Sequence, residues 1–279
     1  MNSIADQMLT LYVFVADFLA EHPNLANWRR SHNGQPEFTD AEVITIGLMQ
    51  GCFGVATLKQ TYRLVNNNYR DAFPLLPTYA QWLSRLHPLS FLLAHLWWEA
   101  LRQHKMPGCL YLLDSKPIPV CKQIRHGRVR LMRVEGAYFG RSSTGWFFGF
   151  KLHLLVHHSG VILAAMLTAG NCSDKDADVM QELVAWAAGG AALVDLGYRD
   201  QGLVAYLEDD QGVVLINPSQ AGERRGLISS LRERVETSFS GLWNRFVDRV
   251  FSRSFPGLWS AIQLKILHFN LCRTGTIVC

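Results

Sequence analysis

The sequence lacks the features of an exported, membrane-embedded or disulfide-stabilised protein. Its longest apolar stretch, residues 161–169, is far shorter than the roughly 18 residues that a membrane helix requires. The start, MNSIADQMLTLYVF, has neither the positive charge nor the small-residue cleavage site of a signal peptide. The six cysteines are scattered without a CxxC pair, which favours reduced thiols over disulfides or a zinc site. These absences predict a cytoplasmic protein without a membrane partner.

Two common catalytic signatures are missing as well. The chain has no GxSxG pattern and no Walker pattern, which argues against an α/β-hydrolase and a P-loop enzyme. What it does have is the composition of a folded globular protein, with 49% hydrophobic and 18% charged residues over 279 positions. We therefore expect one large or two ordinary domains with an ample core.

The net charge of +4 is unevenly distributed. Residues 1–109 hold eight basic and eight acidic side chains, so the whole excess lies in 110–279. Within that part, residues 121–133 have five Lys or Arg and no acid, and a second basic stretch covers 224–253. Such clusters suit a polyanion, although each could also be a solvated loop or helix face.

The first 107 residues are predicted to form an all-α domain. The segment FTDAEVITIGLMQG begins with a capping box, in which Thr39 is the N-cap and Glu42 follows three residues on. Helical patterns ATLKQTYRLVNN, PTYAQWLSRL and SFLLAHLWWEALRQH follow. Such a unit often contains a helix-turn-helix, so we expect this domain to bind DNA. Its neutral charge weakens this prediction, and its apolar stripes fit a core equally well.

Residues 108–279 are predicted to form a mixed α/β domain. Strand-like segments begin at YLLD and continue as GWFFGFKLHLLVHH, VILAAMLTAG, ALVD and GVVLINPS. Helical segments alternate with the later strands, which gives the order β-β-β-α-β-α-β-α. This order predicts a mixed sheet flanked by helices.

Two of the buried strands are expected to end at an aspartate, Asp114 after YLL and Asp195 after ALV. Ligand sites of open α/β sheets lie at the carboxyl ends of strands, so these aspartates can converge if their strands are neighbours. The helix predicted over LISSLRERVETSFSGLWNRF adds Glu236. Three carboxylates in one pocket would repel unless Mg²⁺ or Mn²⁺ neutralised them, and two such ions can clamp a phosphodiester.

Each carboxylate also has a simpler interpretation. A strand-end aspartate often caps the following turn, and Glu236 alone would fit a solvated helix face. Asp174, Asp200 and Glu233 are nearby rivals for the same role, although Asp174 fits the start of its helix better.

Several blocks of the sequence resemble the DDE transposases of bacterial insertion sequences. They are DSKPIPVC after the first strand, GWFFGFKLHLLV, LTAGNCSD, DLGY and RERVET, and FTDAEVITIGL and AFPLLPTYAQWLSRL in the N-terminal part also fit. The similarity covers nearly the whole chain and implies an RNase H-like catalytic domain after the all-α N-terminal domain. It places the family's two aspartates on Asp114 and Asp195 and its glutamate on Glu236.

The resemblance implies a transposase that uses two Mg²⁺ or Mn²⁺ ions. Water would cut the phosphodiester at the element's end, and the freed 3′-OH would then attack target DNA without a covalent enzyme intermediate. The partners would be the terminal inverted repeats and the target duplex, bound by at least a dimer in the bacterial cytoplasm with the nucleoid. Arg232 matches a family arginine. The predicted DNA contacts are Lys116, Lys122, Arg125, Arg128, Arg130, Arg133, Arg232, Arg245 and Arg249.

Some positions depart from the family pattern or fit other roles. Leu196 stands where many relatives have lysine, and Trp243 stands where a basic residue often follows the glutamate. Either Arg245 substitutes for that basic residue, or the contacts to the DNA end are weaker in this protein. His153, His157 and His158 fit structural positions, since 153 and 157 lie about 13 Å apart on a strand. Trp146 and Trp243 fit the core better than a base-stacking site.

Two other functions remain open. One is a DNA-binding repressor that keeps the fold without catalysis, and it would show no metal dependence. The other is an RNase H-like repair nuclease, which the helical N-terminus disfavours and which would not be restricted to an inverted repeat.

Overall fold

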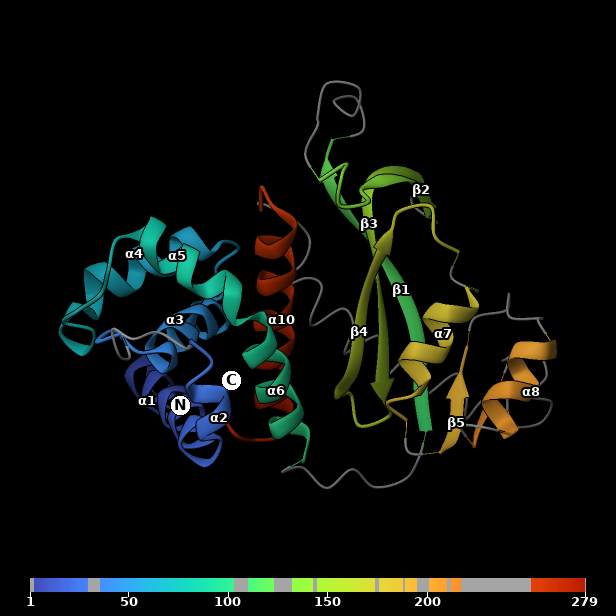
Figure 1. The fold of residues 1–279 in the computed structure, drawn as a ribbon, viewed down its shortest axis with the longest axis horizontal. Coiled ribbons are helices and arrows are strands. Elements are labelled where there is room, and N and C mark those ends of the chain that lie inside the picture. Colours follow the sequence, from blue (N-terminus) through green and yellow to red (C-terminus); the bar gives the residue numbers. More distant parts are fainter. Residues whose placement is uncertain are drawn as a thin grey trace. The chain divides into compact units, whose positions relative to one another are not determined.

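The computed structural model describes residues 3–29, 36–102, 110–122, 132–142, 145–173, 176–187, 189–194, 201–209, 212–216 and 252–278. The chain divides into two compact units, one helical and one built around a sheet (Figure 1). The division falls between His104 and Lys105, three residues before the boundary expected from the sequence.

Several helices of the helical unit begin at a polar N-cap residue. Four of its helices begin with a capping box, in which a Ser or Thr side chain accepts the N3 amide and the N3 side chain bonds back to the cap. The predicted pair of Thr39 and Glu42 is one of them. The helices are α1 (Ile4–Glu21), α2 (Pro23–Ala26), α3 (Asp40–Phe53), α4 (Leu58–Asn68), α5 (Tyr79–Leu86), α6 (Ser90–Arg102) and α10 (Phe255–Arg273).

The centre of this unit is α3, which is buried over most of its length. It packs against α1, α4, α5 and α10. The contact with α10 is close, because a side chain on Gly47 would meet Leu264 and one on Gly51 would meet His268. A helix so enclosed shows little amphipathic periodicity.

The C-terminal helix α10 belongs to the helical unit, not to the sheet domain. The predicted range of 108–279 for the second domain is therefore too long at its end. The physical reason is that α10 is buried over most of its length and packs on α3 and α6, with Gln263 bonded to both the backbone and the hydroxyl of Ser90. Most side chains of this helix are buried, so it forms part of the core.

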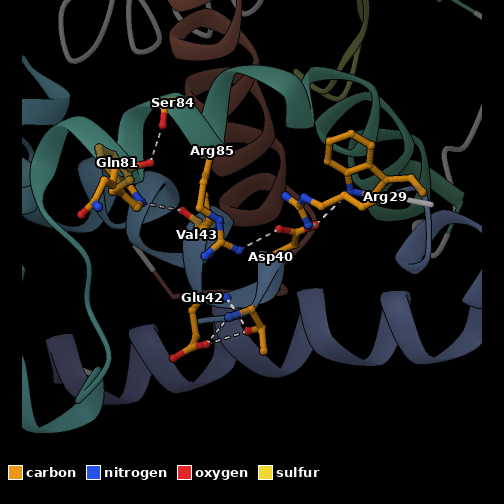
Figure 2. Close-up of polar contacts among 10 residues, drawn as sticks. Arg29, Asp40, Glu42, Val43, Gln81, Ser84 and Arg85 are labelled. Carbon is orange, nitrogen blue, oxygen red and sulfur yellow. Dashed lines mark hydrogen bonds and ion pairs between the residues drawn. The ribbon is translucent and has the colours of Figure 1, made fainter. Parts of the chain in front are cut away.

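A buried carboxylate fastens the segments around α3. Figure 2 shows Asp40 between two arginines, Arg29 and Arg85, which donate to it over 2.5 and 3.2 Å. The indole of Trp28 donates a third bond over 3.0 Å. Because these donors come from the segment before α3 and from α5, Asp40 ties three segments together.

The second unit contains a mixed sheet of six described strands. They are β1 (Leu110–Cys121), β2 (Tyr138–Ser142), β3 (Gly145–His157), β4 (Ile162–Ala169), β5 (Gly190–Leu193) and β6 (Val213–Ile216). The order is β2-β3-β1-β5-β6, and β4 also pairs with β3. Pairs among β1, β2, β3 and β4 are antiparallel, whereas β1, β5 and β6 run parallel (Figure 1). The helices α7 (Ala177–Val184) and α8 (Gln201–Asp209) connect β4 to β5 and β5 to β6.

Strand β1 is longer than the sequence predicted. It does not end at Asp114 but continues through Pro117 and Pro119 to Cys121, paired with β3. The carbonyl of Leu110 accepts a hydrogen bond from the amide of His158, in the segment after β3. The backbone amides and carbonyls of residue 110 and of every second residue after it therefore point toward β3. Both prolines fall on the other alternate positions, where no amide is needed for the pairing.

The strand β2 was not predicted. It pairs with residues 145–149 of β3, while β4 pairs with residues 150–156 along the same strand. Its Gly140 lies so close to Gly170 that a Cβ there would meet the Gly170 carbonyl at 1.9 Å. Because β2 is short and has glycine at this contact, its alternation of apolar and polar residues is too weak to predict a strand.

Two further findings bear on the class of protein. Among the described helices, no single one is long and apolar enough to cross a membrane; α3 and α4 reach that length and composition only as a pair bent by 100°. Cys52, Cys121 and Cys172 are free thiols, as predicted, but Cys272 is disulfide-bonded, so the prediction of reduced thiols is wrong there.

Candidate active site

Asp114 lies inside β1, and β3 pairs with β1 along one edge both before and after this residue. Its register partner in β3 is Leu154. The side chain is half-buried, and one of its oxygens accepts the Ser115 amide over 2.8 Å. A carboxylate placed this way has a fixed base and an oxygen already oriented by the chain.

The strand that leads to Asp195 lies beside the strand that carries Asp114. Strands β1 and β5 are parallel neighbours, and Leu112 is the register partner of Leu193. Asp114 and Asp195 each follow these partners by two residues in the sequence. The condition set by the sequence, that the two strands be neighbours, is therefore met.

Most of the other predicted site residues lie outside the described part of the chain. Among the described residues no group of three His, Cys, Asp or Glu side chains is arranged to hold a metal ion. The rivals Asp174, Asp200 and Glu233 also lie outside. The predicted site residues that lie outside the described part of the chain are Asp195, Glu236, Arg125, Arg128, Arg130, Arg232, Arg245 and Arg249.

Three of the predicted DNA contacts are described. Lys116 follows Asp114 by two residues in the same strand, so both side chains belong to the same face of the sheet, about 7 Å apart along the strand. Lys122 is exposed just after β1 ends. Arg133 is exposed, with its guanidinium 5.4 Å from the ring centre of Phe148. The structure therefore brings Lys116 next to the predicted catalytic aspartate.

The histidines of β3 belong to the opposite face of the sheet. His153 and His157 pair with Ser115 and Tyr111, which alternate with Asp114. Both are buried; His153 bonds to the Thr168 hydroxyl over 2.9 Å and His157 to the Ser159 hydroxyl over 2.8 Å. Structural roles, as predicted, fit these contacts.

The same face carries a buried lysine that the sequence did not single out. Lys151 donates to the carbonyl of Cys172 over 2.7 Å and so holds the turn after β4. Burial raises the pKa of the Cys172 thiol, so this sulfur is protonated near neutral pH. A single lysine within an apolar strand gave no periodic signal that could have identified this role.

Trp146 is exposed, with 58% of its surface accessible, so its predicted place in the core is wrong. It pairs across the β2–β3 hairpin with Arg141, whose guanidinium lies 6.0 Å from the indole centre. The hairpin was not predicted, and the exposure of Trp146 follows from its position at the hairpin's end.

The sheet defines the class of protein. An antiparallel set on one side of β1 and a parallel set on the other, with helical crossovers after β4 and β5, make an RNase H-like mixed sheet preceded by helices. A family model described as the transposase DDE domain matches residues 105–237. Residues 105–237 are therefore similar to a transposase DDE domain, which supports the resemblance to DDE transposases over this part of the chain. No curated protein and no solved structure matches the chain.

Proposed function

We propose that this protein is a DNA transposase that cleaves phosphodiester bonds at the ends of an insertion sequence and joins the freed 3′-OH to target DNA. The observation that carries the proposal is the parallel pairing of β1 with β5, two residues before Asp114 and Asp195. Neighbouring parallel strands that each continue into an aspartate are a suitable base for a shared site.

The described donor fits a hard divalent cation. Asp114 offers carboxylate oxygens, which Mg²⁺ and Mn²⁺ prefer, and one oxygen already accepts a backbone amide, as ligating carboxylates commonly do. We propose that Asp195 and Glu236 complete the ligand set. Two bound ions would supply charge stabilisation to the attacking and leaving oxygens of the phosphodiester.

The basic side chains have a separate role in this proposal. Lys116, on the face of Asp114, would hold a phosphate oxygen of the strand that is cut. Lys122 and Arg133, both exposed, would bind the backbone further along the duplex. Such contacts position the DNA without reading its sequence, and they make binding steeply dependent on salt. A dimer that joins two element ends is part of the proposal.

A strand-cleavage assay tests the proposal. The substrate is a labelled duplex carrying the inverted repeats that flank the gene, incubated with Mg²⁺ or Mn²⁺. We expect wild type to cut at the repeat boundary, and Asp114→Asn and Glu236→Gln to lose at least about a hundredfold in rate, because removing a metal ligand exceeds the effect of removing a residue that supports one. Binding is measured on the same samples and should persist.

The matched control is Asp178→Asn, an exposed carboxylate in the first turn of α7. It makes the same change of charge in the same unit and should leave cleavage near the wild-type rate. Tight binding without cleavage by any of the proteins would favour a non-catalytic repressor. Cleavage that ignores the repeat sequence would favour a repair nuclease, and cleavage that survives both substitutions would refute the triad.

A further inference from the structure

The helix α1 (Ile4–Glu21) carries apolar side chains on two faces. One face is buried where α1 packs on α3, and the other is open to solvent. On the open face Leu9 is 62% exposed, Val13 44% and Tyr12 36%. A surface helix normally has one apolar stripe, so the second stripe is not needed for packing within the helical unit. The buried residues of the first face are Leu11, Val15 and Phe18.

The apolar residues of the open face form one continuous row, called here the outer row. Counted from its first residue, the members follow at spacings of three, four, seven and eleven, which all fall on one side of an α-helix. The row therefore extends over about three helical turns, the length of an ordinary contact between two amphipathic helices. Its members are Leu9, Tyr12, Val13, Ala16 and Ala20.

Two exposed carboxylates border the outer row on one side. Asp6 lies three residues before Leu9, and Asp17 lies four residues after Val13. Helix α1 contains no Lys or Arg that could neutralise them. The third acid of the helix, Glu21, is not counted in this border, because it already interacts electrostatically with the end of α6. The outer row thus has a negatively charged edge.

The charge of this edge indicates which kind of partner fits. A second copy of α1 would bring its own carboxylates and no Lys or Arg, so like charges oppose the pairing of α1 with itself. A helix with Lys or Arg along one flank would instead place opposite charges beside Asp6 and Asp17. The long stems of Lys and Arg would also cover part of the apolar surface.

We propose that the outer row of α1 is a docking site for an amphipathic helix of a partner protein, one with an apolar stripe and with Lys or Arg along one flank. Burial of Leu9, Tyr12 and Val13 supplies the affinity. The ion pairs with Asp6 and Asp17 fix the orientation of the bound helix and exclude acidic helices. This docking is independent of DNA cleavage.

Binding of two fluorescent synthetic peptides to the full-length protein, without DNA or metal, tests this inference. One peptide is an amphipathic helix of leucine and lysine, and the other has glutamate in place of lysine. We expect the leucine–lysine peptide to bind at least about tenfold more tightly, and less tightly as salt is added. The double variant Leu9→Gln with Val13→Gln should weaken its binding about tenfold or more, because two apolar contacts are lost.

Charge reversal gives a gain of binding that misfolding cannot imitate. Asp17→Lys should weaken the leucine–lysine peptide about threefold and strengthen the leucine–glutamate peptide. The matched controls in the same unit are Leu75→Gln, at a side chain that is 53% exposed, and Asp71→Lys, at an exposed carboxylate. Both controls should bind the peptides like wild type, and thermal melting should change little in every variant, since the altered side chains are exposed.

Three results would overturn the inference. The first is equal binding of the two peptides, and the second is binding by the Leu9 and Val13 double variant within twofold of wild type. The third is a wild-type dimer in analytical ultracentrifugation that the double variant loses, with neither peptide bound, because α1 would then pair with a second copy. Stronger binding of the leucine–glutamate peptide by Asp17→Lys, but not by Asp71→Lys, would establish the docking site.

Discussion

At the scale of single residues, the helical unit depends on one buried charge. Asp40 is 8% exposed and accepts bonds from Trp28, Arg29 and Arg85 (Figure 2). Removing its carboxylate leaves two arginines without their partner in a partly buried place, where each remains about one-fifth exposed. Unpaired buried charge is among the largest costs that a single substitution can impose.

We predict that Asp40→Ala lowers the free energy of unfolding by about 3 kcal/mol, the lower end of the range for breaking a buried ion pair, because both arginines keep some contact with water. Urea denaturation followed by circular dichroism measures this loss. The control is Asp17→Ala on the exposed side of α1, which should change stability by less than about 0.5 kcal/mol. Equal losses for the two variants would show that the Asp40 network does not stabilise the unit.

Single residues were predicted best where the chemistry is local. Thr39 and Glu42 lie three residues apart, and a capping box needs nothing beyond that spacing. Asp114 was found because a charge follows an apolar run. Trp146 was misplaced because its exposure depends on the hairpin that β3 forms with β2, a strand that was not predicted.

At the scale of elements, the turn between α3 and α4 sets the direction of a helix. Gly54 has a positive φ of 62°, and a Cβ added there would meet no atom within 4 Å. A substitution therefore changes the backbone preference and creates no clash. The left-handed conformation costs an ordinary residue roughly 1–2 kcal/mol, and asparagine less.

We predict that Gly54→Ala lowers the free energy of unfolding by about 1 kcal/mol, and that Gly54→Asn lowers it by clearly less. Thermal melting of both variants beside wild type provides the comparison. Identical melting of Gly54→Ala and wild type, or a larger loss for asparagine than for alanine, would contradict the left-handed turn.

Five of the six described strands were predicted in their order, whereas β2 and the full length of β1 were not. The strand was expected to end at Asp114, yet Pro117 and Pro119 both direct their missing amide away from β3, so β1 continues. Strand β2 escaped notice because its pairing with β3, rather than its own short sequence, makes it a strand.

At the scale of the whole molecule, the chain forms two units, and the helical unit contains segments from both ends of the sequence. The helix α10 packs with α3 and α6, more than 150 residues earlier in the chain. No local pattern could have predicted this return, because an apolar helix fits the core of either unit equally well. The sheet unit is thus an insertion between helices of the first unit.

The central claim is that the adjacent strands β1 and β5 bring Asp114 and Asp195 to one metal site. The most direct measurement is Mn²⁺ binding, by calorimetry, to wild type, Asp114→Asn, Asp195→Asn and the double variant. If both residues hold the same ions, each single substitution should weaken binding at least about tenfold, and the double should lose less than the two single effects combined. Single variants that bind Mn²⁺ as tightly as wild type would contradict the account.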